Sequence, residues 1–241
     1  MPSRLCPLAP GPVLADTAAG SGGSDGRRTA DGARYLAIPA PTLQPRLNDD
    51  GSTMMSMRTP TTQPIVVSGS HDATVRVWDL ESRELVYEPL KGHKGKVNAV
   101  AVGKLHGRPI AVSGGNDNTV RVWDLDAEGP VYQPLAGHDG NVLAVAVGEL
   151  RGRPIAVSAS DDFTLRVWDL EAGGPLGAPL AGHESWVSAV AVGQLRGRPI
   201  VVSGGGDQLV RVWDLVAGGP LGEPLVGHGD WVTAVALGEA P

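Results

Sequence analysis

Apolar residues in most of the chain fall into short runs separated by glycine, proline, asparagine or aspartate. From residue 97 to residue 135 these runs are 97–102, 109–113, 120–125 and 131–135. They are rich in β-branched residues and have the length of strands. Turn-forming residues separate them: Gly103, Gly107 and Pro109, then 114–118, then 128–130. This pattern predicts four short antiparallel strands.

The same pattern returns every 45 residues. Trp78, Trp123, Trp168 and Trp213 each stand in the sequence Arg-Val-Trp-Asp-Leu. A fixed period of this length indicates one unit copied in tandem, and each copy must stack on its neighbours to bury its apolar face. Four strands per unit form one blade of a β-propeller. We therefore expect an all-β propeller of four blade equivalents, possible as a monomer or completed by dimerisation.

The first strand of each unit also favours a radial arrangement. The sequence Ala-Val-Ala-Val at 99–102 recurs at 144–147 and 189–192. Blades converge at the axis of a propeller, so alanine at alternate positions supplies room while valine fills the space between sheets. A propeller accounts for this better than a linear solenoid.

The N-terminal part of the chain has a different composition. Residues 1–52 are rich in Pro, Gly, Ser, Ala and Asp and show no sustained period. They offer too little apolar surface to offset the entropy of ordering. We expect a disordered tail at 1–52 and a propeller domain at 53–241.

Composition excludes several classes of partner. The formal net charge is -6, with the 20 basic residues scattered, so the chain has no basic stripe for nucleic acid. No apolar run approaches the length of a membrane helix. The single cysteine, Cys6, cannot form an intramolecular disulfide, and Pro7, Pro10 and Pro12 interrupt any signal peptide. These features predict a cytoplasmic protein that binds neither nucleic acid nor membrane.

Three further series keep the 45-residue register. In the second unit they are His93 after a glycine, Ser113 and Asp117, which precedes Trp123 by six residues. This combination resembles the WD40 repeat family, and the match covers residues 62–238. The resemblance implies a non-catalytic propeller whose His, Ser, Asp and Trp form a buried hydrogen-bonded relay that pins the strands of each blade. The sixteen relay positions are His93, Ser113, Asp117, Trp123; His138, Ser158, Asp162, Trp168; His183, Ser203, Asp207, Trp213; and His228, Ser68, Asp72, Trp78.

Other chemistry is disfavoured by the repetition. A Ser-His-Asp set suggests a hydrolase, but this chain carries four such sets and no Gly-x-Ser-x-Gly nucleophile turn. We expect the indole N–H of each tryptophan to be available to the aspartate of its set. Histidines on different blades point apart and cannot converge on one zinc ion. Glycine-rich turns such as 203–207 precede strands, so hairpin turns with positive φ explain them better than phosphate loops. No catalytic residue, metal or cofactor is expected.

The two ends of the repeat region complement each other. The last unit supplies its opening histidine, His228, and the strand 231–237, whereas the first unit clearly supplies only the later strands. We favour closure in which 231–237 pairs with the first unit, because an unpaired apolar edge invites aggregation. A degenerate inner strand at 54–57 is the alternative. For the assembly we rank a homodimer, with an eight-bladed ring, or a larger assembly first, a closed four-bladed monomer second and a fragment of a longer propeller third.

Binding specificity should lie at positions that differ between units. The variable positions follow Gly-His and precede the third strand of each unit, and both sets are expected on one loop face. The resulting candidates for partner contact are Trp186, Trp231, Phe163, His71, Asn116, Asp161, Lys96 and Asn141. Exposed tryptophans near a ring centre suit an interaction hot spot. The predicted function is therefore a scaffold for a protein or peptide partner; the alternative is a regulatory propeller fused to a kinase or a nucleotide-hydrolysing signalling protein.

Overall fold

The computed structural model describes residues 46–47, 53–54 and 64–238, and every regular element in them is a β-strand. The predicted all-β class is confirmed. Strands β1 (Arg46–Leu47) and β2 (Thr53–Met54) pair antiparallel as a small ribbon. The rest of the predicted tail lies outside the described residues, so its disorder stays a prediction.

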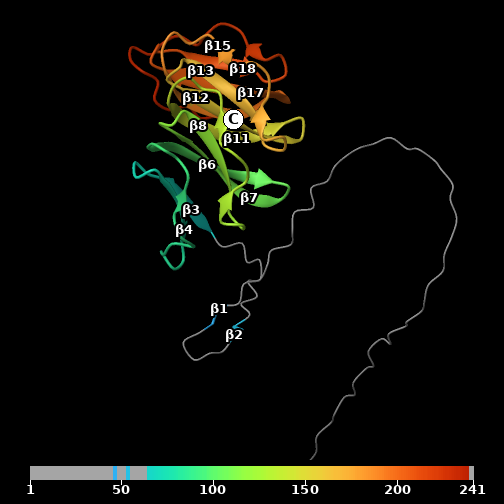
Figure 1. Cartoon of the computed structure of the whole chain (residues 1–241). Helices are drawn as coiled ribbons and strands as arrows, with labels where there is room; N and C mark the ends of the chain where they lie inside the picture. The colour runs from blue at the N-terminus through green and yellow to red at the C-terminus, as the bar shows by residue number, and fades with distance from the viewer. Residues whose placement is uncertain (1–45, 48–52, 55–63, 239–241) are drawn as a thin grey trace, which may run out of the picture. The chain divides into compact units, whose positions relative to one another are not determined.

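Four antiparallel sheets follow, one per repeat, and we call them the first to fourth blades (Figure 1). The first blade holds β3 (Ile65–Gly69), β4 (Thr74–Asp79) and β5 (Leu90–Lys91). The second holds β6 (Val97–Leu105), β7 (Arg108–Gly115), β8 (Thr119–Asp124), β9 (Gly129–Pro130) and β10 (Leu135–Ala136). The third holds β11 (Val142–Leu150), β12 (Arg153–Ser160), β13 (Thr164–Asp169), β14 (Gly174–Pro175) and β15 (Leu180–Ala181). The fourth holds β16 (Val187–Leu195), β17 (Arg198–Gly205), β18 (Val210–Asp214) and β19 (Gly219–Pro220).

The inner strands are longer than predicted. In the second blade β6 continues through Gly103 to Leu105, and the chain reverses at His106 and Gly107, whose φ values are 52° and 79°. Two consecutive residues with positive φ form the tight hairpin turn that matches the twist of long strands. Gly103 therefore does not end the strand as predicted, and its lack of a side chain leaves room for Val147 of the next blade.

The outermost strand is split, whereas the sequence predicted one strand at 131–135. In the second blade β9 and β10 pair separately with the two ends of β8. Pro134 stands directly before β10 and has no N–H to donate to a ladder. The chain therefore leaves the sheet between the two short strands.

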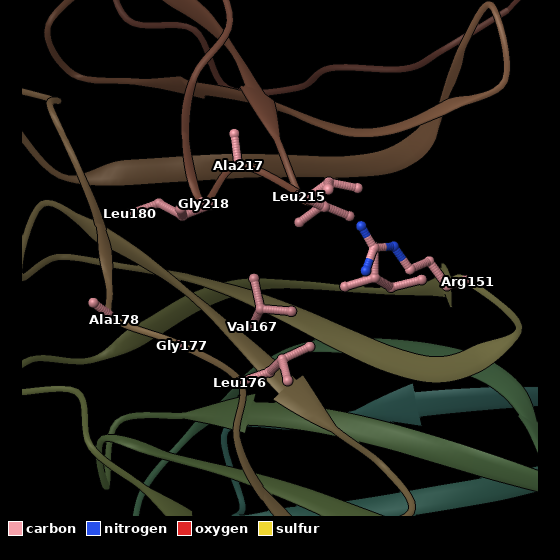
Figure 2. Close-up of a pocket in the computed structure, with 11 residues that line it drawn as sticks. Arg151, Val167, Leu176, Gly177, Ala178, Leu180, Leu215, Ala217 and Gly218 are labelled. Carbon is pink, nitrogen blue, oxygen red and sulfur yellow. The ribbon is translucent and has the colours of Figure 1, made fainter.

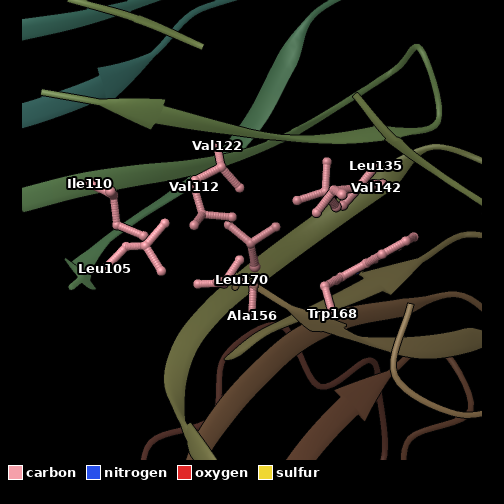
Figure 3. Close-up of a cluster of buried hydrophobic side chains, with 11 residues drawn as sticks. Leu105, Ile110, Val112, Val122, Leu135, Val142, Ala156, Trp168 and Leu170 are labelled. Carbon is pink, nitrogen blue, oxygen red and sulfur yellow. The ribbon is translucent and has the colours of Figure 1, made fainter. Parts of the chain in front are cut away.

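The blades pack face to face through apolar side chains. The cluster between the second and third blades brings Val112 and Val122 of one sheet against Ala156, Trp168 and Leu170 of the next (Figure 3). Equivalent residues form the clusters between the first and second and between the third and fourth blades. Each blade thus presents two different faces. One face carries Ile, Val or Leu from the two middle strands, and the other face carries the relay tryptophan and the leucine two residues after it.

Glycines in the inner strands allow neighbouring blades to approach. A Cβ at Gly148 would contact the side chain of Val192 on the next inner strand. Gly103 stands in the same relation to Val147, and Gly193 to Leu237. We expect Gly148→Ala to cost about 1 to 3 kcal/mol of unfolding free energy through overpacking, measured by urea denaturation. Gly174→Ala is the matched control, because a Cβ there meets nothing; equal losses at both sites would contradict the expected close approach.

The first and fourth blades are not joined within one chain. No strand pairing or extensive contact connects β3–β5 with β16–β19 among the described residues, and β3 lies at an edge of its sheet. Figure 1 shows β3 and β4 at one end of the row of blades and β17 and β18 at the other. The expected closure by 231–237 is therefore wrong for a single chain. That segment instead lies on the fourth blade, where the N–H of Val232 donates to the carbonyl of Gly205 at 3.0 Å.

Candidate functional site

Three of the four predicted relays have the same hydrogen-bonded geometry. In the second blade His93 Nδ1 lies 2.9 Å from Asp117 Oδ1 and His93 Nε2 lies 2.8 Å from Ser113 Oγ. The indole N–H of Trp123 donates to Ser113 Oγ at 2.8 Å. The third and fourth blades repeat these bonds through His138, Ser158, Asp162, Trp168 and His183, Ser203, Asp207, Trp213. The tryptophan thus donates to the serine, so the prediction that it would donate to the aspartate is wrong.

These bonds fit a neutral imidazole. Ser113 accepts from Trp123, so its hydroxyl can donate to His93 Nε2, while Nδ1–H donates to the Asp117 carboxylate. Burial, together with the positive charge of Arg121, lowers the pKa of His93, and the contact with Asp117 opposes this without overcoming it. Burial likewise lowers the pKa of His138 and His183. The relays of these three blades are therefore uncharged at histidine.

Donors around Asp117 and Asp162 hold these two carboxylates ionised. Burial raises the pKa of Asp117, but hydrogen bonds from the Lys94 N–H, His93 and Thr119 outweigh burial and bring the pKa below its usual value. The pKa of Asp162 is lowered in the same way, burial again being outweighed by bonds from Thr164 and His138. Ser113, Ser158 and Ser203 are completely buried. A substrate cannot reach these serines, so the geometry is that of a structural pin within each blade.

The first blade has an incomplete relay. Trp78 donates to Ser68 Oγ at 2.8 Å, but within the described residues no histidine is hydrogen-bonded to Ser68 or Asp72. Asp72 is exposed and binds Thr74 Oγ1 and Arg76, with Arg76 Nη2 2.8 Å from Asp72 Oδ2. His228 is exposed at the other end of the row. The fourth relay of the prediction is therefore absent within one chain, for the same reason as the missing closure.

The two variable sets of positions do lie on one face in the second to fourth blades. Backbone bonds join them directly: the N–H of Asn116 donates to the Lys96 carbonyl at 2.8 Å, that of Asp161 to Asn141 at 3.0 Å, and that of Gly206 to Trp186 at 2.9 Å. We call this surface the loop face. Each blade contributes one residue from the loop before its inner strand and one from the turn before its third strand.

The two tryptophans outside the relays meet on the loop face. Their ring centroids are 5.0 Å apart with an interplanar angle of 77°, an edge-to-face contact. Trp186 is half-buried over Gly206, whereas Trp231 is 57% exposed. The prediction that adjacent blades place them side by side agrees with this contact. The pair leaves a broad aromatic surface in solvent.

The other candidates form a less continuous set. Lys96, Asn116 and His71 are exposed, and Asn98 donates to Asn116 Oδ1 at 2.6 Å. Asn141 donates to Asp161 Oδ2 at 2.6 Å, so these two side chains are partly occupied with each other. Phe163 is 45% exposed, and no ring contact links it to either tryptophan within the described part of the chain. The structure thus joins four of the candidates as two side-chain pairs, Trp186 with Trp231 and Asn141 with Asp161.

The glycine-rich turns have a different explanation from the predicted one. In the turn after β17 the residue with positive φ is Gln208, at 65°, and its equivalents Asn118 and Phe163 behave alike. The glycines before it give room for packing instead: a Cβ at Gly206 would meet the Trp186 ring, and one at Gly204 would meet Val232. Phe163 has a φ of 70°, a value that bulky L residues rarely adopt.

A pocket that the sequence analysis missed lies between the third and fourth blades (Figure 2). Its lining is aliphatic apart from Arg151 and includes Leu176, Gly177, Leu215 and Gly218. Leu215 and Gly218 follow the end of β18, and β18 starts at the loop face, so this side of the pocket lies away from the loop face.

A change of residue type in the 45-residue register explains this pocket. In the cluster between the second and third blades the equivalent of Gly177 is Tyr132, whose ring packs on Gly173. Burial, with the nearby charge of Asp169, raises the pKa of Tyr132 to about 12. Tyr87 occupies the same position in the first blade. The series Tyr87, Tyr132, Gly177 was the sequence signal for this hollow.

No group of three or more His, Cys, Asp or Glu in the described residues has the arrangement of a metal site. Within the same ranges no helix is long and apolar enough to cross a membrane.

Comparison with known proteins supports the repeat assignment. Four stretches match the sequence family described as WD domain, G-beta repeat, at residues 45–79, 83–124, 129–169 and 174–214. The first match begins at residue 45, ahead of the predicted domain boundary at residue 53. No curated protein sequence matches the chain.

A solved structure also resembles the chain. The crystal structure of the computationally designed Ika8 protein is 34% identical, with a TM-score of 0.62. The match covers 74% of this chain and 51% of Ika8, so this chain spans about half the length of that protein.

Proposed function

Since the chain belongs to the WD40 repeat family, whose repeats generally mediate protein-protein interactions, we propose that it is a non-catalytic scaffold. Its partner is a protein or peptide that binds the loop face. The Trp186–Trp231 pair carries this proposal. Such a pair is a large, rigid anchor surface of the kind that dominates the energy of protein interfaces.

The charges around the pair indicate the chemistry of the partner. Glu184 and Asp230 are exposed in the same two loops as the tryptophans, and Asp161 lies on the neighbouring third blade. Acidic groups beside aromatic faces favour cations and oppose carboxylates. We propose a peptide segment with an apolar anchor residue flanked by Lys or Arg.

The relay chemistry supports a non-enzymatic role. The hydrolase-like serines are buried and each accepts an indole N–H, so their oxygen atoms are committed to holding a blade together. The same sets recur in successive blades, as expected for a framework and not for one active site.

Selection from a displayed random-peptide library tests the loop face. We expect selected peptides to be enriched in basic residues around an aromatic or aliphatic anchor. Trp186→Ala and Trp231→Ala should each weaken the selected peptides at least about 10-fold, the scale of a hot-spot residue. Trp231→Ala should keep the unfolding midpoint near that of wild type, since Trp231 is largely exposed.

Val216→Asp is the control for this measurement. Val216 is exposed, and the equivalent positions in the other blades are Glu81, Asp126 and Glu171. The Val216→Asp variant should bind the selected peptides as tightly as wild type does. Peptides that bind with equal affinity to wild type and both tryptophan variants would show that the loop face is not the binding site.

A further inference from the structure

The two end blades carry apolar faces that are covered everywhere else in the repeat. On the first blade Leu80 is 52% exposed, whereas its equivalents Leu125, Leu170 and Leu215 are 8%, 0% and 8% exposed. Trp78 is half-buried, although the other relay tryptophans are fully buried. Val66 beside it is exposed as well. This is the tryptophan-bearing face, which in the other blades packs on the preceding blade.

The fourth blade exposes the opposite face. Leu225 is 58% exposed, while its equivalents Leu90, Leu135 and Leu180 are 5%, 3% and 3% exposed. With Ile200, Val202, Val210 and Val212 it lines an apolar groove that continues onto Leu237. The equivalent face of the third blade, including Val157 and Leu180, packs on Val201, Trp213 and Leu215. The end faces are therefore the two halves of one interface that the chain already builds three times.

The first blade also lacks an inner strand, and a matching strand lies at the other end of the chain. Segment 231–238 stacks on the fourth blade as each inner strand stacks on the blade before it. Ser188 Oγ donates to the Val232 carbonyl at 2.7 Å, as Asn98 Nδ2 donates to Val142 at 2.9 Å. Leu237 packs at Gly193, as Val147 does at Gly103. Yet no β-strand among the described residues pairs with 231–238.

We propose that two copies of this chain close into a ring in which segment 231–238 of each copy becomes the inner strand of the other copy's first blade. The antiparallel register of β11 and β12, which sets Val147 opposite Ala156, would set Leu237 of one copy opposite Val66 of the other. His228 would then reach Ser68 and Asp72 and complete the missing relay. The first blade cannot form that relay without the second copy.

The glycine pattern favours this segment over the chain's own upstream residues. Gly238 is the equivalent of Gly103, Gly148 and Gly193, each of which accepts an aliphatic side chain from the next inner strand. Val102, which is 53% exposed, would be the side chain that Gly238 accepts. In the chain's own 45-residue register this position is Arg58, which offers no such room.

A second copy also satisfies the geometry of closure better than one chain alone. The first and fourth blades are apart in the single chain, and a head-to-tail interface forms a closed assembly when its rotation completes a circle. The four blades match about half of the Ika8 chain, so two copies supply the full length of that structure. This points to two chains and eight blades.

Light scattering on the full chain tests the assembly. We expect a mass of twice the 24.9 kDa of one chain at micromolar concentration. Leu80→Asp and Leu225→Asp, on opposite end faces, should each weaken association at least about 100-fold and give monomers that keep the wild-type circular dichroism. Val216→Asp should remain dimeric. A monomeric wild type, or a dimer that survives both leucine substitutions, would overturn the proposal.

Disulfide trapping identifies the partner strand. With Cys6→Ser as background, Val66→Cys and Leu237→Cys should cross-link under oxidation into a species of dimer mass on a non-reducing gel. A cross-linked monomer would show closure within one chain, and no cross-link would show that 231–238 does not pair with β3; either result overturns the proposal. Trp231 stands at the start of the segment, where its equivalents Lys96, Asn141 and Trp186 directly precede the inner strands. The cross-link reports on Leu237 at the other end of the segment, so a peptide-binding failure and an assembly failure are separate results.

Discussion

Trp168→Ala should lower the unfolding free energy by about 3 to 5 kcal/mol, the cost of deleting a large buried aromatic side chain. Trp168 is completely buried and packs among Val142, Leu135 and Leu170 between the second and third blades. Domains of this size are stable by about 5 to 15 kcal/mol, so much of the protein's stability would be lost. Urea denaturation followed by circular dichroism measures the loss.

Two further substitutions separate the causes of this loss. Trp168→Phe keeps most of the buried volume but removes the donor to Ser158 Oγ, so we expect a loss of about 1 to 2 kcal/mol. Trp231→Ala removes the same side chain from an exposed site and should cost less than about 1 kcal/mol. A Trp168→Ala variant no less stable than Trp231→Ala would show that the relay tryptophans do not hold the blades together.

The repeat made the interior of each blade predictable. Residues such as Ser113 and Trp123 lie in neighbouring strands of one hairpin, so their spacing in sequence determines their pairing. The contact of Trp186 with Trp231 was also predictable, because the two residues stand at equivalent positions of successive repeats and their loops stack. The strand order, the relay members and this aromatic contact could therefore be expected from sequence.

Features that depend on single atoms or on the angle between blades could not be predicted from the sequence. The choice of Ser113 over Asp117 as acceptor for Trp123 depends on which oxygen atom lies nearer the indole. The failure of 231–237 to reach β3 depends on the rotation between successive blades, which small differences in packing at each interface determine. The pocket at Gly177 was visible in the register as a lost tyrosine, but its size depends on how Leu215 and Gly218 pack beside it.

Acidification from pH 7.5 to pH 5 should destabilise the protein through the three complete relays. His93, His138 and His183 have fully buried side chains. Burial holds the pKa of each below 6.5, the value expected in the unfolded chain. As pH falls below 6.5 the unfolded chain therefore binds more protons than the folded one, so stability is fully present above this value and is lost as pH falls. A proton on His93 Nε2 would also face Ser113 Oγ, which already accepts from Trp123.

The slope of the unfolding free energy against pH depends on how many relay histidines stay neutral in the folded chain. Each one that stays neutral in the fold contributes up to about 1.4 kcal/mol per pH unit to the slope, so three give up to about 4 kcal/mol per unit. Unfolding free energies measured by urea at several pH values above 5 give the slope, away from the range where the aspartates titrate. His138→Gln should reduce the slope by about a third even though it lowers stability. Stability that is independent of pH between 7.5 and 5 would mean that the relay histidines accept protons in the folded chain as readily as in the unfolded one, and the relay would then tolerate charge at histidine.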